Sequence, residues 1–504
     1  MIPLSSSTLD DLEAAGLVSV PRYDRSRVTA GIVHIGVGGF HRAHQAVAVD
    51  DLLRAGVPGS EGFGICGVGV LEQDRAMKDA LDAQDGLYTL LVKHPDGHRE
   101  ARVVGSIVEY LLAVDDPEAV IEKMASPEVR IVSLTITEGG YNIDPVTGVF
   151  DLDHAGVRHD LQPGVAPTTV FGLVVAALAR RRLRGVGAFT VMSCDNVQGN
   201  GAVVRAAFTA FARAKDPELA EWLAGHVRFP SSMVDRITPV TTEVDRAEVL
   251  ESFGVDDAWP VVTEPFFQWV LEDDFDAGRP AYDHAGVQLV HDVEPYELMK
   301  LRLLNASHQG LCYLGYLAGY RYAHEACADP GLVAFLRGYM DEEATPTLLP
   351  VPGIDLDAYK GQLVERFANP EIRDTLARLC AESSDRIPKW LLPVVRANLA
   401  SGGQVERSAA IVASWARYAE GVDEQGERID VVDRLADELV PLARSQRERP
   451  TAFIENEALF GDLGHQARFV AAYVEALRTI TEQGSRAAIE RYGRGSSHPV
   501  VRPA

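Results

Sequence analysis

The chain has 504 residues, 46% of them hydrophobic and 24% charged, which is ordinary for a globular protein of roughly two to four domains. Its formal net charge of −25 argues against nucleic acid and anionic membrane surfaces as partners. No apolar run approaches the roughly 18 residues of a membrane-spanning helix, and the N-terminus lacks the pattern of a signal peptide. We therefore expect a cytoplasmic protein.

The five cysteines are scattered along the chain, at positions 66, 194, 312, 327 and 380. They form no CxxC pair and no His/Cys cluster at zinc spacing, so we expect no metal site. Their low, odd number favours a reducing compartment.

The first element with a chemical signature is a short buried strand at 31–35, followed by a glycine-rich turn and a helix to about residue 55. Strand, glycine turn and helix in this order are typical of dinucleotide binding, because glycines let the backbone approach a pyrophosphate. His41 occupies the place of the third glycine of the usual fingerprint. The residues expected to contact the cofactor here are Ile35, Gly36, Val37, Gly38, Gly39 and Phe40.

A second strand is predicted at 64–70, and acidic residues follow it. Asp74 or Glu72 could accept both ribose hydroxyls of NAD and repel the 2′-phosphate of NADP. Their distance from the glycine turn exceeds the usual separation of about 20 residues, which implies a longer loop before the strand. The alternative is an acid that caps a helix.

Two further buried strands, at 130–136 and 188–193, deliver loops to the same sheet edge, where ligands of open α/β sheets bind. Glu138 lies in the first loop and could instead be a solvated acid. Asn196 lies in the second, where its amide could donate to an oxygen without carrying charge. Helices are predicted at 170–184 and from about 202 to 225, with Asn200 as the cap of the latter.

The segment 231–239 is predicted to be a loop, in which Asp235 and Arg236 could form a structural ion pair. Residues 259–273 are expected to be extended. Helical periodicity dominates after about Pro295. We therefore predict a dinucleotide-binding α/β domain at 1–290 and a mostly helical domain at 291–504, with the helix from Pro295 lining the cleft between them.

That helix carries three polar residues, Lys300, Asn305 and His308, in a run rich in leucine. At 100° per residue they fall within an arc of about 140°, and Lys300 and His308 are about 12 Å apart along the axis. They could converge on one small ligand. The alternative is a solvated stripe on an amphipathic helix.

Five motifs together resemble the polyol-specific long-chain dehydrogenase family, over nearly the whole chain. They are Gly36-Val37-Gly38-Gly39-Phe40-His41-Arg42-Ala43-His44, Thr137-Glu138-Gly139-Gly140-Tyr141, Ser193-Cys194-Asp195-Asn196, Val234-Asp235-Arg236-Ile237-Thr238-Pro239, and Lys300 with Asn305 and His308. The resemblance implies a Rossmann-type N-terminal domain, a mostly α-helical C-terminal domain, and metal-independent oxidation of a polyol to a ketose with NAD, or less favourably NADP.

The resemblance also implies roles for single residues. Lys300 would be the general base, Asn196 and Asn305 would hold the reacting oxygen, and His308 would position the substrate. The remaining matched residues are Asp235, Arg378 and Arg386 as substrate contacts, Glu297 in proton exchange with solvent, and Asp74 and Glu138 at the cofactor. Such a reaction needs a base within hydrogen-bond reach of the hydroxyl, because hydride leaves the carbon only as the oxygen loses its proton.

We expect interconversion of D-mannitol and D-fructose by a monomer or small homo-oligomer. Arabinitol, sorbitol or a uronate such as fructuronate are alternative substrates, and a uronate would need cationic contacts such as Arg378 and Arg386 could supply. Two other readings are a zinc-dependent polyol dehydrogenase and a catalytically inactive nucleotide-sensing protein. The latter would need the glycine turn but not Lys300, Asn196 and Asn305 together.

Overall fold

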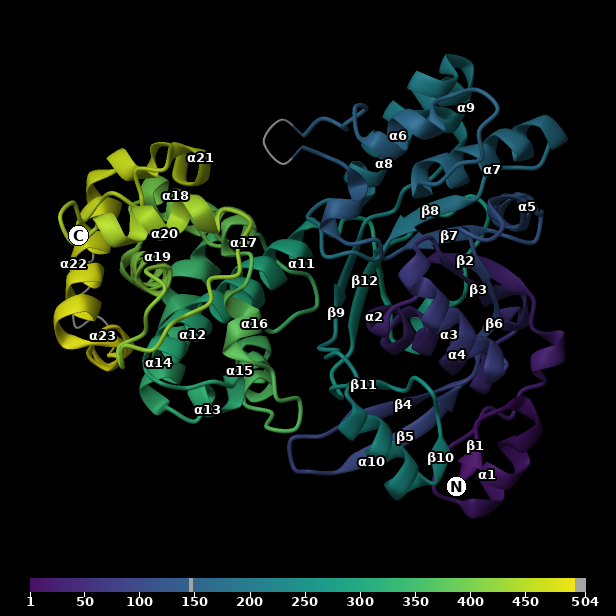
Figure 1. Cartoon of the computed structure of the whole chain (residues 1–504), viewed down its shortest axis with the longest axis horizontal. Helices are drawn as coiled ribbons and strands as arrows, with labels where there is room; N and C mark the ends of the chain where they lie inside the picture. Colours follow the sequence, from purple (N-terminus) through teal and green to yellow (C-terminus); the bar gives the residue numbers. More distant parts are fainter. Residues whose placement is uncertain (145–147, 495–504) are drawn as a thin grey trace. The chain divides into compact units, whose positions relative to one another are not determined.

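The computed structural model describes residues 1–144 and 148–494 (Figure 1). The chain divides into two compact units, Met1–Glu294 and Pro295–Ala504. The division falls four residues beyond the predicted boundary at 290. In the described part of the chain, no helix has both the length and the apolar character needed to cross a membrane.

A parallel sheet of five strands forms the centre of the first unit, in the order β6-β3-β2-β7-β8 (Figure 1). The strands are β2 (Ala30–Ile35), β3 (Gly64–Gly69), β6 (Ile107–Leu112), β7 (Ile131–Leu134) and β8 (Thr190–Ser193). The chain reverses its direction of winding between β2 and β7. Their carboxyl ends therefore form the switch point where ligands bind in such sheets.

Helices cover both faces of this sheet, which explains why every residue of β2 and β3 is buried. Val33 and Ile35 pack into a layer with α5 (Pro117–Ala125), α7 (Val170–Arg184), α8 (Asn200–Lys215) and α9 (Pro217–His226). Ile32 and Ile65 pack on the opposite face with α3 (Gln45–Arg54) and α4 (Arg75–Ala83).

The rest of the first unit consists of short strands and helices around this core. The strands are β1 (Ile2–Pro3), β4 (Tyr88–Lys93), β5 (Arg99–Val104), β9 (Ser232–Asp235), β10 (Val255–Asp256), β11 (Val261–Thr263), β12 (Gln268–Glu272) and β13 (Gln288–Val290). The helices are α1 (Leu9–Ala15), α2 (Gly39–Ala43), α6 (Ala155–Asp160) and α10 (Glu243–Phe253).

In the first unit, three predicted elements differ from the structure. The helix expected to run from the glycine turn to residue 55 is broken at His44, whose φ and ψ of −124° and −90° are not helical. The helix predicted from 202 to 225 is broken at Asp216, whose side chain accepts from the amides of Glu218 and Leu219 and so caps α9. Pro217 suits the first position of this new helix. The segment 231–239 is not all loop, since β9 pairs antiparallel with β12.

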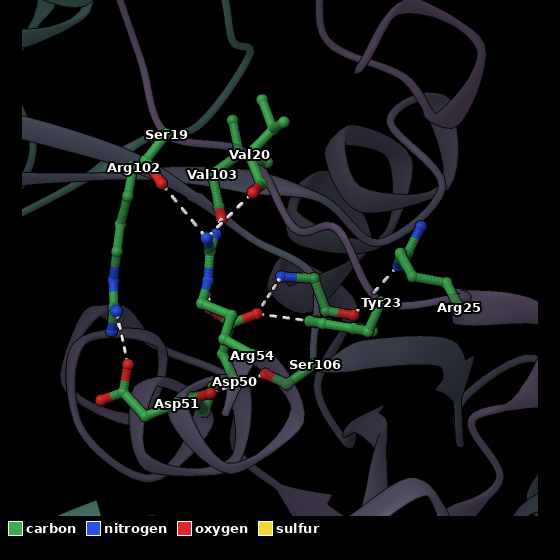
Figure 2. Close-up of polar contacts among 12 residues, drawn as sticks. Ser19, Val20, Tyr23, Arg25, Asp50, Asp51, Arg54, Arg102, Val103 and Ser106 are labelled. Carbon is green, nitrogen blue, oxygen red and sulfur yellow. Dashed lines mark hydrogen bonds and ion pairs between the residues drawn. The ribbon is translucent and has the colours of Figure 1, made fainter. Parts of the chain in front are cut away.

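A buried carboxylate fixes α3, the second helix after the glycine turn (Figure 2). Asp50 accepts hydrogen bonds from the Tyr23 hydroxyl at 2.6 Å, Arg54 Nε at 2.6 Å and the Gly105 amide at 3.0 Å. Arg54 also donates to the Val20 carbonyl at 2.9 Å. Donors from three separate segments thereby satisfy the hydrogen-bonding capacity of one carboxylate, as its burial requires.

The described part of the second unit consists of helices joined by loops. Its helices are α11 (Glu294–Met299), α12 (Ala306–Leu317), α13 (Ala323–Cys327), α14 (Pro330–Gly338), α15 (Leu356–Phe367), α16 (Leu376–Cys380), α17 (Ser383–Trp390), α18 (Leu392–Ser401), α19 (Glu406–Tyr418), α20 (Ala436–Ser445), α21 (Glu457–Phe460), α22 (Ala467–Gln483) and α23 (Ser485–Gly493). Helix α12 is buried on nearly all sides. A Cβ at Gly310 would lie only 3.1 Å from Ile411, so glycine allows this close packing.

The predicted continuous α-helix from Pro295 is interrupted by a π-helical turn at Lys300–Asn305. The Ala306 amide bonds to the carbonyl of Leu301, five residues back. A π turn holds more residues than an α turn, so the calculation at 100° per residue does not apply to Lys300 and Asn305. Such turns occur frequently at functional sites.

A second π-helical turn, Tyr339–Ala344, carries the buried carboxyl of Glu343. It accepts bonds from the Arg407 amide at 2.6 Å and the Ser408 amide at 2.8 Å. Burial nevertheless raises the pKa of Glu343 from 4.5 to about 7. The folded state therefore holds this proton more tightly than the unfolded chain does.

We expect Glu343 to contribute stability that is fully present below pH 4.5 and is lost as the pH rises through about 7. Between pH 5 and 8 the loss should be about 2–3 kcal/mol. Urea unfolding of the wild type and of Glu343→Gln, which cannot titrate, would measure it. If the free energy of unfolding depended on pH in the same way in both proteins, the prediction would be contradicted.

Candidate active site

The turn after β2 can be built only with glycine. Gly36 has a φ of +94°, and a Cβ there would lie 2.1 Å from the Thr135 carbonyl oxygen. Gly38, the N-cap of α2, is open: the only atom within 4 Å of its would-be Cβ is the Gly36 carbonyl oxygen, at 3.9 Å. The turn therefore presents bare backbone at the switch point, the feature that a pyrophosphate needs.

The two acids predicted after β3 have different partners. Asp74 Oδ2 accepts from the amides of Val70 at 2.8 Å and Leu71 at 2.9 Å, while Oδ1 has no hydrogen-bond partner among the described residues. Glu72 is bound by Arg75 at 2.7 Å, and Arg75 also pairs with Asp115. Asp74 is thus anchored with one oxygen still available for a ligand, whereas the carboxylate of Glu72 is already engaged.

We expect Asp74→Ala to raise the ratio of kcat/KM for NADP to that for NAD, because it removes the repulsion of a 2′-phosphate. The matched variant Glu72→Ala should leave this ratio nearly unchanged. Initial rates with both cofactors provide the measurement. A larger shift in Glu72→Ala would assign the ribose contact to Glu72 instead.

The loop after β7 contains a strained residue and is fastened by Asp195. Thr137 has a φ of +66°, a conformation that residues other than glycine rarely adopt. Asp195 accepts from the amides of Ile136 and Thr137, both at 3.0 Å, and from the Tyr141 hydroxyl at 2.6 Å. Burial raises the pKa of Asp195, and these three donors act in the opposite direction. Asp195 therefore holds in place the loop that carries Glu138.

The two asparagines after β8 differ in position. Asn196 is half-buried directly beyond the strand end. Asn200 was predicted to cap α8, but the residue at the cap position is Gly199. The Asn200 side chain instead bridges to β9, donating to the Ser232 carbonyl at 2.7 Å and accepting from the Ser232 amide at 2.9 Å.

Asp235 is the last residue of β9 and is buried. The predicted alternative of an Asp235–Arg236 ion pair is wrong. Neighbouring strand residues point to opposite faces. Arg236 donates instead to the carbonyls of Ala43 at 2.6 Å and Glu264 at 3.2 Å, and its guanidinium lies over the Phe267 ring.

In the second unit, Glu297, Lys300 and Asn305 are each only 7% exposed. A solvated stripe is therefore excluded for them. Asn305 Oδ1 is buried without a hydrogen-bond partner among the described residues, an arrangement that costs free energy unless a ligand completes it. His308 is half-buried, and its ring packs on Phe367 at 4.3 Å.

The two predicted basic contacts already have partners within the second unit. Arg378 forms a two-point ion pair with Asp374, at 2.6 and 2.5 Å, and its side chain is 59% exposed. Arg386 donates to the Leu379 carbonyl at 3.0 Å and lies over the Trp390 ring.

Comparison with known proteins identifies the family. The model of the mannitol dehydrogenase Rossmann domain matches residues 30–284, and that of the mannitol dehydrogenase C-terminal domain matches residues 292–481. The chain belongs to the mannitol dehydrogenase family. The predicted family, the fold class and the expectation of a dehydrogenase are thereby confirmed.

Several relatives resemble the chain over nearly its full length. Mannitol 2-dehydrogenase of Phaeosphaeria nodorum is 46% identical, over 97% of this chain and 86% of its own. That of Aspergillus fumigatus is 45% identical, over 97% and 99%. The structure of Pseudomonas fluorescens mannitol 2-dehydrogenase in ternary complex with NAD and D-mannitol has a TM-score of 0.88 and 46% identity, covering 97% and 99%. A D-sorbitol dehydrogenase in substrate-free form has a TM-score of 0.88 and 39% identity, covering 96% and 100%.

Within this family member, sequence reasoning missed Asp195 as the residue that fastens the loop at the sheet edge. An acid directly after a buried strand was a signal that could have identified it.

No group of three or more His, Cys, Asp or Glu side chains in residues 1–144 and 148–494 is arranged to hold a metal ion. All five cysteines are buried, and none of them forms a disulfide bond.

Proposed function

We propose that this protein interconverts D-mannitol and D-fructose with NAD as the hydride acceptor. The observation that carries the proposal is its full-length likeness to a solved enzyme that holds NAD and D-mannitol, at 46% identity. The open turn at Gly38 and the anchored carboxylate of Asp74 fit the pyrophosphate and ribose of that cofactor. NAD would supply the carbon that accepts the hydride.

In the proposed mechanism, Lys300 takes the proton of the hydroxyl that is oxidised and returns it when the ketose is reduced. A buried amine can serve as a base near neutral pH, because burial disfavours its charged form. Asn196 and Asn305 donate hydrogen bonds to the same oxygen and stabilise its developing negative charge. His308 positions the substrate, Glu297 exchanges the proton with solvent, and Asp235 binds a hydroxyl.

The pairing of Arg378 with Asp374 favours a neutral polyol over a uronate, because that cation is already neutralised. D-Sorbitol is the second candidate substrate, on the strength of the likeness to D-sorbitol dehydrogenase. Both polyols would use the same base and amides. They differ in stereochemistry, which the hydroxyl contacts must distinguish.

Initial rates on D-mannitol, D-sorbitol, D-arabinitol and, in the reductive direction, D-fructose and fructuronate would test the proposal. We expect the highest kcat/KM for the D-mannitol and D-fructose pair, unchanged in a chelator. Fastest turnover of sorbitol or of the uronate would reassign the substrate. Loss of activity in the chelator would favour a zinc-dependent mechanism, and NAD binding without any turnover would favour a nucleotide sensor.

A further inference from the structure

A buried chain of polar groups runs from the core of the first unit to the glycine turn. Its links are side chains on β2, β7 and α3, on the residue that follows β7 and on the short turn before β13, and it ends at a backbone carbonyl. In order, the members are Tyr282, Gln45, Ser133, His34, Thr135 and the carbonyl of Gly36. The consecutive distances between their polar atoms are 3.4, 2.8, 2.8, 2.9 and 2.6 Å.

Counting hydrogens from the turn fixes the direction of the first links. A carbonyl can only accept, so Thr135 gives its single hydroxyl hydrogen to the Gly36 oxygen at 2.6 Å. The Thr135 oxygen must then accept its other bond, from Nε2 of His34 at 2.9 Å. His34 therefore carries a hydrogen on Nε2.

The same count continues beyond the imidazole. A neutral ring has one N–H, so Nδ1 of His34 accepts from the Ser133 hydroxyl at 2.8 Å. Ser133 has then used its hydrogen, so its other bond must come from the Gln45 amide nitrogen. The structure is drawn with the Gln45 amide oxygen toward Ser133 at 2.8 Å and the nitrogen toward Tyr282 at 3.4 Å, so the relay requires the two ends of this amide to be exchanged. The exchange leaves the shape of the side chain unchanged and lets the Tyr282 hydroxyl donate to the amide oxygen.

The surroundings of His34 keep the ring neutral. It is fully buried, it stacks on the ring of His41 at 3.5 Å, and no carboxylate bonds to either of its nitrogens. Burial lowers the pKa of His34 to about 3. In the opposite tautomer, Nε2 would accept the Thr135 hydrogen, and the Gly36 carbonyl would lose its donor.

We propose that His34, as the neutral Nε2–H tautomer, is the centre of an ordered hydrogen-bond relay that fixes the Gly36 carbonyl and so positions the glycine turn for the dinucleotide. His34, Ser133 and Gln45 are positioning residues, since they act on the cofactor only through Thr135 and Gly36. The role in cofactor binding rests on the proposed use of NAD. The direction of the relay does not.

Breaking the relay at two separate links tests the binding role. Ser133→Ala and Thr135→Val should each raise the dissociation constant of NADH by about five- to tenfold, the effect of one lost hydrogen bond. Thr135→Ser keeps the hydroxyl, so this variant should bind NADH with the dissociation constant of the wild type. Because both variants cut one chain, the double variant should weaken binding no more than the larger single change. Fluorescence titration of NADH gives the values, and additive effects would overturn the relay.

Ser106→Ala is the matched control. Ser106 is fully buried in the same unit and donates one hydrogen bond to the Ala46 carbonyl at 2.6 Å, outside the relay. It should lower the melting temperature about as much as Ser133→Ala does, with the dissociation constant of NADH unchanged. Equal weakening of NADH binding in this control would show that Ser133 acts only through general stability.

The tautomer can be measured without any ligand. In protein labelled with ¹⁵N-histidine, the His34 signals, assigned by their loss in His34→Gln, should show the Nε2–H pattern. An Nδ1–H or doubly protonated ring would overturn the proposal. If the wild type fails to bind NADH, the proposed cofactor is wrong and the positioning role falls with it, while the NMR pattern still decides the relay's direction.

Discussion

Lys300→Ala should lower kcat by about 10²-fold or more, the lower range for the loss of a general base. The dissociation constant of NADH should change little, because in the proposed mechanism the amine acts on the substrate oxygen rather than on the nucleotide. Stopped-flow measurement of hydride transfer and titration of NADH separate the two effects. A near-normal rate would place the base elsewhere.

The second unit offers a matched lysine. Lys360 is 4% exposed, comparable to Lys300, and it pairs with Asp357 at 2.8 Å and with Asp341. Lys360→Ala removes the same side chain from a structural ion pair. We expect a lower melting temperature with hydride transfer unaffected, so a comparable fall in rate would mean that truncation of any buried lysine damages this unit.

An added amine distinguishes a base from a structural cation. Lys300→Ala leaves a space that a small primary amine can enter, and its uncharged form can take the substrate proton. Activity should return in proportion to the concentration of free amine as the pH rises. A quaternary ammonium ion of similar size has no lone pair and should restore nothing.

The sequence was sufficient where burial and periodicity act locally. The hydrophobic run at 170–184 predicts α7 with its observed ends, and the β-branched run at 130–136 predicts β7 to within two residues at each end. Both elements lie in the core, where the pattern of apolar side chains decides the structure.

Other features depend on tertiary contacts that local patterns do not encode. The π-helical turn at Lys300–Asn305 contains ordinary helix-forming residues, so nothing in the sequence marks it. The side chain of Asn200 looked like a helix cap, but it bonds to β9, a strand 32 residues further along the chain. Asp195 was passed over because its partners, the amides of Ile136 and Thr137, precede it by nearly 60 residues.

The proposed role of Asn305 is tested by a pair of substitutions. Asn305→Ala should lower kcat/KM by about 10²–10³-fold, as found when one donor to a developing oxyanion is removed. Asn305→Asp keeps the shape of the side chain but replaces the donor by a negative charge, so kcat/KM should fall at least as far as in Asn305→Ala. A mild effect of Asp with a severe effect of Ala would instead indicate that the side chain only fills space.

Asn398 provides the control for this pair. It is also buried, and its amide nitrogen donates to the Glu343 carbonyl at 2.9 Å. Asn398→Ala should therefore destabilise the second unit while leaving kcat/KM nearly unchanged. The contrast has a physical origin: Asn398 completes its bond within the protein, whereas Asn305 Oδ1 is buried without a partner among the described residues. In the proposed complex, a substrate hydroxyl that donates to this oxygen would remove that cost, so part of the binding free energy would come from satisfying this buried group.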